Sequence, residues 1–241
     1  MSAATADGAF DGVIFDLDGV LVHTDDLHFE AWSTIADRLG IPFTAEDNNR
    51  LRGVSRMESL EILLNLGDAD LGLSAAEKEA LATEKNNVYV ALLDRLTPDD
   101  ADAGVVETLE VLRERGVRLA IGSSSKNAKP ILDRIGLRGH FEVIADGETI
   151  SQSKPHPEVF LQAAENLGLE PARCVVVEDA FAGVDAAIAG GFPAAALGDA
   201  TAHEGITWSL GSLPDLVDIV APQGDLVAVR CPRSFGQLRF P

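Results

Sequence analysis

Basic residues are scarce in this chain. Its 241 residues include 19 Lys and Arg against 39 Asp and Glu, which gives a formal net charge of -20. Such an acidic surface repels polyanions, which argues against nucleic acid and anionic membranes as partners. Only five lysines occur, so an anionic substrate has to meet cations that are placed locally: Lys78, Lys85, Lys126, Lys129 and Lys154.

Cysteines and long apolar runs are scarce as well. The two cysteines, Cys174 and Cys231, do not make a disulfide framework, and Cys174 opens an apolar run in which a small buried side chain fits. No apolar run approaches ~18 residues, and the segment MSAATADGAF has neither a basic patch nor the apolar region of a signal peptide. We therefore expect a reducing, cytoplasmic location without export or a membrane span.

Apolar segments of strand length alternate with helical patterns along most of the chain. The strand-like segments are GVIFDLD, VRLAIGSSS, FEVIADG, CVVVEDA and, more weakly, PAAAL. Between them, residues such as Val105, Leu109 and Leu112 lie on one face of a helix. This alternation predicts an α/β fold whose core is a doubly wound, parallel, Rossmann-like sheet.

One stretch, roughly residues 24–98, interrupts this alternation. It separates the first two strands by far more residues than a crossover helix needs, and it contains helical patterns such as Met57, Leu60 and Leu64 but no convincing strand. A linker rich in Pro, Asp and Gly follows at residues 97–104. We expect residues 1–23 and 99–241 to form the core domain and residues 24–98 to form a helical cap. The tail, 221–241, fits either an added edge strand or a loose end.

Two carboxylates follow the first apolar segment. If Val13 to Leu17 form a strand, Asp16 and Asp18 share a face at its end, because residues i and i+2 of a strand point the same way. Paired like charges are costly there unless a counter-ion neutralises them. Taken alone, however, this motif fits a turn or a solvated strand end as well as a metal site.

Polar groups follow other strands too, at the sheet edge where doubly wound folds bind ligands. They are Ser123, Ser124, Ser125 and Lys126 after one strand, Glu178 and Asp179 after another, and Lys154 in the loop SKPHP. Each has an ordinary alternative, since hydroxyls cap helices, acids begin helices, and a lysine before proline lies in many solvated turns. Their joint occurrence, in this order, favours a common site.

One reaction class suits these groups. Carboxylates that converge without His or Cys ligands suit a hard cation, and Mg²⁺ commonly combines a few carboxylates with water and a substrate phosphate. Asp16 would then attack phosphorus and form an acyl phosphate, while Asp18 handles the proton of the leaving or entering hydroxyl. Ser123 and Lys154 would hold the oxygens of the transferring phosphoryl group.

The order of these groups resembles the four motifs of the haloacid dehalogenase superfamily of phosphotransferases. The matching residues are Asp16 and Asp18 in DLDG, Ser123, Lys154 in SKP, and Glu178 with Asp179. More narrowly, HTDDLHFEAW, LRGVSRMESLE, EKNNVY, SSSKN and SKPHPEVF resemble the β-phosphoglucomutases, which carry a helical cap between the first two core motifs. This second likeness spans about Gly12 to Leu197.

The resemblance implies that β-glucose 1-phosphate and glucose 6-phosphate are interconverted through a bound bisphosphate, with Asp16 carrying the phosphoryl group. It implies that Mg²⁺ is held by Asp16, the backbone carbonyl of Asp18, Glu178 and Asp179. The distal, non-transferring phosphate would meet Arg56 of the cap and, from the core, Ser125, Lys126 and Asn127. The cap and hinge residues that would help to position Asp18 are Thr24, His28 and Lys85.

Alternatives remain at several positions. His28 and Lys85 also fit ordinary polar contacts of a cap helix, and Arg56 also fits a solvated charge at a helix start. Two residues depart from the family pattern. His23 stands where Asp or Ser is more common, and Arg52, a substrate-binding candidate at the cap entrance, stands where Lys is familiar.

Three functions fit the whole pattern. The first is a cap-gated sugar-phosphate mutase, and the second is a phosphatase in which water takes the phosphoryl group from Asp16. The third is a sensor without catalysis, against which the Asp16 and Asp18 pair argues, because binding alone needs no nucleophile. We expect a monomeric enzyme whose partner is a small sugar phosphate.

Overall fold

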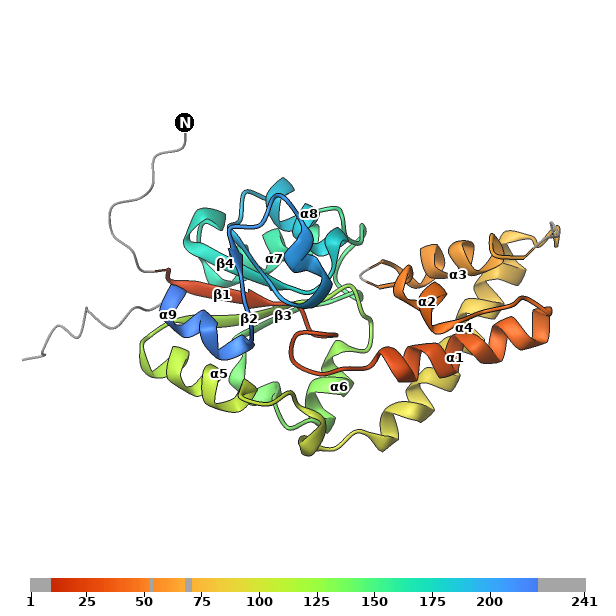
Figure 1. The fold of residues 1–241 in the computed structure, drawn as a ribbon, viewed down its shortest axis with the longest axis horizontal. Helices are drawn as coiled ribbons and strands as arrows, with labels where there is room; N and C mark the ends of the chain where they lie inside the picture. Colours follow the sequence, from red (N-terminus) through yellow and green to blue (C-terminus); the bar gives the residue numbers. More distant parts are fainter. Residues whose placement is uncertain (1–9, 53, 68–70, 221–241) are drawn as a thin grey trace, which may run out of the picture.

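The fold is built around one parallel sheet, seen in a computed structural model that describes residues 10–52, 54–67 and 71–220. Within these residues, six strands follow the order β3-β2-β1-β4-β5-β6 (Figure 1). Their bounds are β1 (Gly12–Phe15), β2 (Arg118–Gly122), β3 (Val143–Ala145), β4 (Cys174–Glu178), β5 (Ala194–Ala196) and β6 (Trp208–Ser209). Each neighbouring pair is parallel, which confirms the predicted doubly wound architecture.

Helices cover both faces of the sheet. The helices that pack on the sheet are α5 (Val105–Glu114), α6 (Ala128–Arg134), α7 (Glu158–Leu167), α8 (Phe181–Ala189) and α9 (Leu216–Val220). Side chains alternate along β1: Val13 and Phe15 join the apolar cluster that contains α5 and α6, while Ile14 joins the cluster that contains α7 and α8. The strands are therefore buried on both faces, as their continuous apolar runs indicate.

A helical insert follows β1. It contains α1 (Asp25–Leu39), α2 (Ala45–Asn49), α3 (Arg56–Leu64) and α4 (Ala75–Leu92), and it forms the right-hand lobe of Figure 1. Its helices share an apolar cluster of their own, which includes Trp32, Ile35, Leu60 and Leu81. The described part of residues 24–98 thus contains helices and no strand, as expected, while the domain limits at 24 and 98 stay a prediction. No helix in the described part of the chain is long and apolar enough to cross a membrane.

The two linkers of the insert lie against each other. Val22, in the outgoing linker, forms isolated β-bridges both to Asp18 and to Ala101 of the returning linker. The Asp102 N–H also donates to the Leu21 carbonyl at 3.0 Å. The outgoing and returning linkers are therefore bonded to each other close to Asp18.

The structure corrects the predicted end of the first strand. The predicted strand reached Leu17, but β1 ends at Phe15, because the Leu17 carbonyl accepts a turn hydrogen bond from the Leu21 N–H at 3.0 Å. The two-residue strand β6 was not predicted, since so short a segment carries no alternation. The predictions for the N-terminal segment and for the tail, 221–241, concern residues outside the described ranges, apart from Phe10.

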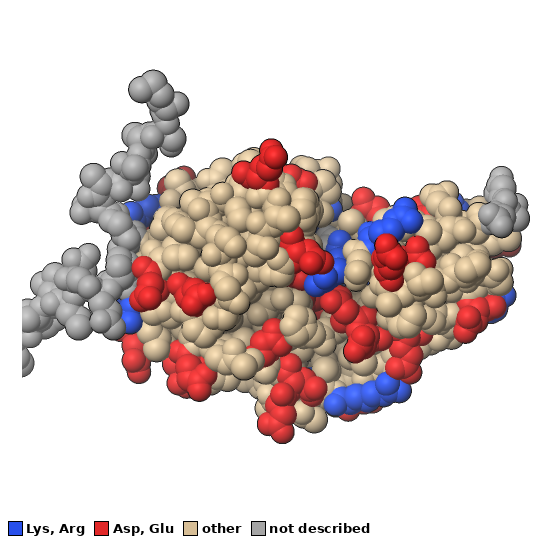
Figure 2. All heavy atoms as spheres, viewed as in Figure 1, with Lys and Arg blue, Asp and Glu red and all other residues tan. Residues whose placement is uncertain are grey.

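Acidic side chains are scattered over both lobes on the face drawn in Figure 2, whereas several basic side chains gather where the two lobes meet. A cavity of about 520 Å³ lies at this junction, between the carboxyl ends of the strands and the insert. Basic side chains thus gather beside this cavity, as an anionic substrate would require in so acidic a protein.

Candidate active site

The cavity collects most of the residues that the sequence singled out. Those that line it are Asp16, Asp18, His28, Arg52, Arg56, Lys85, Ser123, Ser125, Lys126, Asn127 and Asp179. Three others, Thr24, Lys154 and Glu178, are buried behind this lining. Residues far apart in the sequence therefore meet, because parallel strands end at the same edge of the sheet.

Three carboxylates form the centre of the sheet side. Asp16 directly follows β1, and Glu178 and Asp179 lie at the end of β4, the strand paired with β1. One oxygen from each lies within 4.8 Å of the other two, and all three side chains are buried. Oxygen donors in such a cluster fit a hard divalent cation, so these residues could hold a metal.

Lys154 is the counter-ion within this cluster. Its Nζ bonds the Asp16 carboxylate and lies 2.5 Å from Glu178 Oε1. Burial alone would lower the pKa of Lys154, but Asp16 and Glu178 outweigh it and raise this pKa, so the ammonium is charged. The lysine in the SKPHP loop is therefore a buried charge at the site and not a solvated turn residue.

The pKa values of two acids of this cluster, Asp16 and Asp179, are raised. Burial raises the pKa of Asp16, which Lys154 opposes and the neighbouring carboxylates reinforce. Burial and Glu178 raise the pKa of Asp179 to about 7, although Arg52 acts in the opposite direction. A further cation at this position would favour the ionised forms of Asp16 and Asp179.

Asp18 lies apart from the cluster and is held from the hinge side. The Thr24 hydroxyl donates to Asp18 Oδ1, and burial raises the pKa of Asp18 although this hydrogen bond lowers it. Gly19, the next residue, has φ 86°, and a Cβ there would overlap the Asp179 carboxylate. Only glycine therefore fits this turn beside Asp179, at the end of β4.

His28 and Lys85 face each other from α1 and α4. Lys85 Nζ lies 2.7 Å from His28 Nδ1, and it also stands 4.6 Å and 4.9 Å from the ring centroids of Tyr89 and Trp32. Burial lowers the pKa of Lys85 to about 7 and, with the nearby cations, lowers the pKa of His28 well below its usual value. A neutral His28 can therefore accept a hydrogen bond from Lys85, and the pair forms a polar wall of the cavity.

Arg56 begins α3 and reaches a partner that the sequence did not indicate. Its Nη2 donates to Asn86 Oδ1 at 2.7 Å, and the same oxygen accepts from Asn127 Nδ2 at 3.0 Å. Asn86 lies on α4 in the insert, whereas Asn127 lies just before α6 in the sheet lobe. The only sequence signal for Asn86 was its position after Lys85 in EKNNVY.

The loop after β2 carries the hydroxyls. Ser123 is buried, donates its N–H to the Ala145 carbonyl at 3.1 Å, and accepts at Oγ from the Ser125 N–H at 3.1 Å. Ser125 Oγ in turn accepts from the Asn127 N–H at 3.1 Å. Successive turns of this loop therefore direct Ser123, Ser125 and Asn127 towards one cavity.

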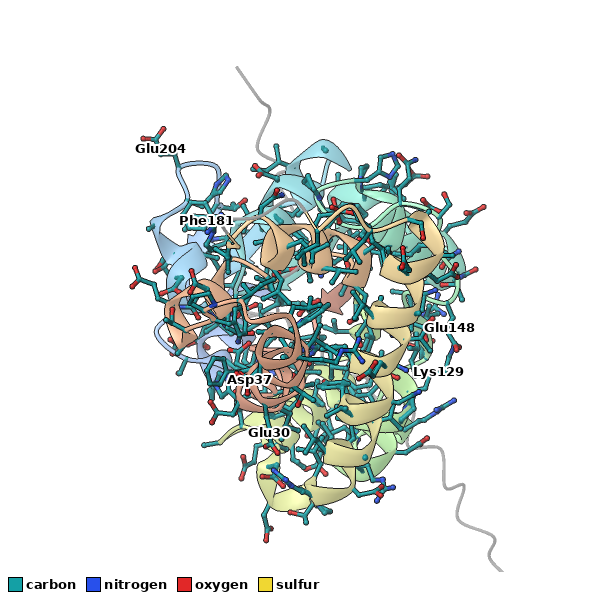
Figure 3. All side chains as sticks on the ribbon, turned by 90° about the vertical axis from the view of Figure 1, so that its right-hand side faces the viewer. Glu30, Asp37, Lys129, Glu148, Phe181 and Glu204 are labelled. Carbon is teal, nitrogen blue, oxygen red and sulfur yellow. The ribbon has the colours of Figure 1, made fainter. Side chains whose placement is uncertain are left out.

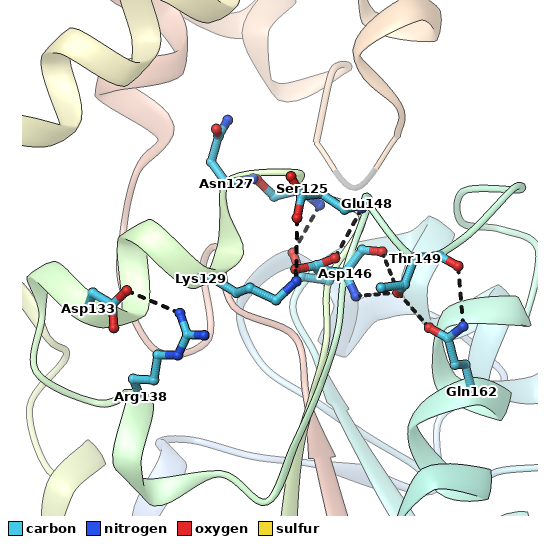
Figure 4. A network of polar contacts seen from close by, with 10 residues as sticks. Ser125, Asn127, Lys129, Asp133, Arg138, Asp146, Glu148, Thr149 and Gln162 are labelled. Atoms are coloured by element: carbon cyan, nitrogen blue, oxygen red, sulfur yellow. Dashed lines mark hydrogen bonds and ion pairs between the residues drawn. The ribbon is translucent and has the colours of Figure 1, made fainter.

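A charged pair supports this loop from the side of β3 (Figure 4). Lys129 Nζ lies 2.8 Å from Oδ2 of the buried Asp146, whose Oδ1 accepts from the Glu148 N–H at 3.0 Å. The Gly147 N–H donates to the Ser125 carbonyl at 3.1 Å. Lys129 and Glu148 lie side by side near the surface (Figure 3), with 3.4 Å between Lys129 Nζ and Glu148 Oε2. Lys129 therefore ties the start of α6 to the loop after β3.

Arg52 contacts the acid cluster from the insert. Its guanidinium pairs with Asp179, lies 3.3 Å from Asp25 and 3.6 Å from Asp199. Its charge is thus directed at carboxylates of the site entrance. His23, the other departure from the family pattern, is exposed and pairs with Asp102 at 3.2 Å.

A doubly wound sheet with an acid cluster and a buried lysine at its carboxyl edge, covered by a helical insert after the first strand, defines a class of capped α/β enzyme. The chain belongs to the haloacid dehalogenase-like hydrolase family, whose model matches residues 10–191. This confirms the superfamily that the motifs predicted.

Individual relatives confirm the narrower likeness. The chain is 42% identical over 186 residues to β-phosphoglucomutase of Bacillus subtilis (strain 168), covering 77% of this chain and 82% of that protein. A crystal structure of β-phosphoglucomutase from Clostridium difficile matches with a TM-score of 0.81 and 35% identity, over 86% of this chain and 93% of that chain. The chain is also 34% identical to a phosphorylated carbohydrates phosphatase of Thermotoga maritima, over 75% of this chain and 82% of that protein.

Proposed function

We propose that this enzyme is a sugar-phosphate mutase that interconverts β-glucose 1-phosphate and glucose 6-phosphate. In this proposal Asp16 is phosphorylated transiently, and a bound bisphosphate is the intermediate. The observation that carries it is the presence of two separate groups of phosphate-binding candidates in one cavity. Asp16, Ser123 and Lys154 form one group, while Arg56 and Asn127 form the other.

The chemical step begins at Asp16. Its carboxylate attacks the phosphorus of the bisphosphate, and the bond between phosphorus and the sugar oxygen breaks. Asp18 donates its proton to that oxygen, which its raised pKa supports. In the second half, β-glucose 1-phosphate binds to the phosphorylated enzyme, and Asp18 removes the proton of its 6-hydroxyl as this oxygen attacks phosphorus; the bond between phosphorus and Asp16 breaks and the bisphosphate forms again.

The remaining residues position the reacting groups. Ser123 and Lys154 bind oxygens of the transferring phosphoryl group, since phosphoryl transfer depends mainly on positioning and charge stabilisation. Asp16, the backbone carbonyl of Asp18, Glu178 and Asp179 would hold Mg²⁺, which would offset the negative charge of that group when bound. Thr24, His28 and Lys85 keep Asp18 in place when the insert is closed.

The distal phosphate distinguishes a mutase from a phosphatase. A phosphatase binds the phosphate that it cleaves, whereas a mutase must also hold the other end of the bisphosphate. Arg56, Ser125, Lys126 and Asn127 supply that second group of donors. Closure over both phosphates would also exclude water, which competes with the sugar for the phosphoryl group.

A phosphatase remains the second candidate. The named relatives include phosphatases as well as a mutase, among them a fructose-1-phosphate phosphatase of Escherichia coli that is 31% identical. In that case water would attack the phosphorylated Asp16, and Asp18 would remove its proton. Both candidates use the same nucleophile and differ in the acceptor.

Phosphorus NMR of the enzyme with Mg²⁺, β-glucose 1-phosphate and a trace of β-glucose 1,6-bisphosphate tests the proposal. A mutase converts the glucose 1-phosphate signal into that of glucose 6-phosphate with little inorganic phosphate. Accumulation of inorganic phosphate without isomerisation would instead establish the phosphatase. A reaction that proceeds equally well with EDTA would refute the proposed role of Mg²⁺.

A further inference from the structure

Asn86 makes a contact that spans the cavity. Its amide oxygen accepts two hydrogen bonds, one from the Arg56 guanidinium at 2.7 Å and one from the Asn127 side-chain amide at 3.0 Å. Arg56 and Asn86 belong to the insert, whereas Asn127 belongs to the sheet lobe. One neutral oxygen thus links the two lobes through two donors that both line the cavity.

The two donors match the chemistry of a phosphate oxygen. A guanidinium and an amide N–H₂ that converge on one oxygen are suited to an anionic acceptor, which binds such donors about twice as strongly as a neutral one does. Within the described residues, Arg56 has no carboxylate at ion-pair distance, and burial lowers its pKa. The positive charge of Arg56 is therefore held by a neutral acceptor that an anion can replace.

We propose that Asn86 is a positioning residue that occupies the place of a distal phosphate oxygen until substrate binds. Its amide oxygen holds Arg56 and Asn127 together across the cavity and then releases both donors to the phosphate. The proposal rests on the proposed function, because it takes the distal phosphate as the ligand of Arg56 and Asn127. It adds a residue that no sequence motif marked for this role.

The neutrality of Asn86 is essential to this exchange. An aspartate at the same position would keep the geometry but place a negative charge beside Arg56. It would bind Arg56 more strongly and would repel an incoming phosphate dianion at the same time. An alanine would remove this link between the lobes without adding a charge, and the pair of Arg52 with Asp179 would remain.

The neighbouring Asn87 provides a matched control. It is exposed, lies on the same helix and does not line the cavity, so Asn87→Asp changes the net charge of the protein as Asn86→Asp does. Circular dichroism first establishes that each variant is folded. The comparison between the two aspartate variants then isolates the position of the charge from its presence.

Binding of glucose 6-phosphate in the presence of Mg²⁺, measured by calorimetry, is the first readout. We expect Asn86→Asp to weaken binding at least tenfold and to raise KM with kcat changed less than about threefold, while Asn87→Asp stays within about twofold of the wild type. Equal affinities of the two aspartate variants would overturn the proposal. Loss of kcat with unchanged KM in Asn86→Asp would also overturn it.

Small-angle X-ray scattering of Asn86→Ala is the second readout. We expect this variant to be more extended than the wild type without ligand and equally compact with saturating glucose 6-phosphate. Identical scattering of both ligand-free proteins would contradict the link between the lobes. A wild type that binds glucose 6-phosphate but only hydrolyses it would refute the mutase, whereas an isomerising wild type with equal aspartate variants would refute Asn86 alone.

Discussion

Asp16 and Asp179 reach the cavity from the ends of two paired strands of one sheet, whereas Arg56 and Asn86 reach it from two helices of the insert. The first end is buried, charged and fixed by the β1 and β4 backbone. The second end is joined to the sheet lobe by a hydrogen bond between two neutral amides, which the Asn127 side chain donates to Asn86 Oδ1. The proposed mechanism places bond making at the first end, and selection of the acceptor at the second end, whose geometry depends on how the lobes meet.

The largest effect is expected at the first end. Asp16→Asn should lower turnover by orders of magnitude, because an amide cannot form the acyl phosphate, while folding stays nearly intact. Steady-state assays followed by phosphorus NMR measure this loss. Asp26→Asn, an exposed change of the same kind, is the control and should have near wild-type turnover. Near wild-type turnover of Asp16→Asn would end the covalent mechanism.

Asp18 should show the next largest effect. Asp18→Asn should lower turnover by ~10²–10⁴-fold, because proton transfer is lost. Mg²⁺ binding should remain, since only the backbone carbonyl of Asp18 is proposed as a ligand. Calorimetric titration with Mg²⁺ alongside the rate at saturating Mg²⁺ separates the two roles. Collapsed Mg²⁺ affinity with a preserved rate would mean that Asp18 is a ligand and not the acid.

Arg56→Ala removes the cation that the insert is proposed to contribute to the distal phosphate. Loss of one charged phosphate contact should cost on the order of 1.5–3 kcal/mol, roughly ten- to a hundredfold in mutase efficiency. Hydrolysis of the Asp16 phosphate should fall much less, so the product ratio should shift towards inorganic phosphate. The ratio of glucose 6-phosphate to inorganic phosphate gives the result directly. An equal decrease in both reactions would remove Arg56 as the distal anchor.

Lys85, a buried cation of the insert, should affect the free energy of unfolding in a pH-dependent way. Its folded pKa of about 7 lies below its usual value of 10.5. Between these values the unfolded state binds the extra proton, so the contribution of Lys85 to folding becomes more favourable as pH rises. Lys85→Met should therefore raise the free energy of unfolding by on the order of 2 kcal/mol at pH 6, and by less at pH 10. Urea unfolding at both pH values measures this difference, and a gain that grows with pH would contradict the assignment.

The last prediction compares a buried with an exposed ion pair of the sheet lobe, and the exposed pair should give the smallest effect. Lys129→Met leaves the carboxylate of the buried Asp146 without its cation and should cost about 1–3 kcal/mol of stability. Arg138→Met breaks the exposed pair with Asp133 on the same lobe and should cost less than about 1 kcal/mol. Thermal unfolding compares the two variants. Equal costs would show that burial of Asp146 adds nothing to the support.

The sequence predicted the sheet side well because most residues there follow an apolar run. Asp16, Ser123 and Glu178 could be assigned to one edge from the sequence alone, since parallel strands place their ends together. Lys154 could be included through its motif. The end of β1 was placed too late, because the turn hydrogen bond that stops it involves the backbone of Leu17, which carries no pattern.

The insert side was harder to predict for a physical reason. Asn86 is a polar residue on a helix, where such residues ordinarily face solvent, and its role depends on the packing of two lobes. The pairing of Lys129 with Asp146 likewise joins residues from separate elements whose spacing says nothing about contact. Their distances follow from tertiary structure alone.

The bridges of Val22 to both Asp18 and Ala101 give the insert a fulcrum. With 15 residues, α1 extends about 22 Å from its start near this point. A rotation of about 10° about the fulcrum would therefore carry the far end of α1 by about 4 Å, while atoms within about 4 Å of the fulcrum would move less than about 1 Å. The displacement thus grows with distance from Val22. Such a rotation would open the rim of the cavity by several ångströms while Asp18, bridged to Val22, would move by less than about 1 Å.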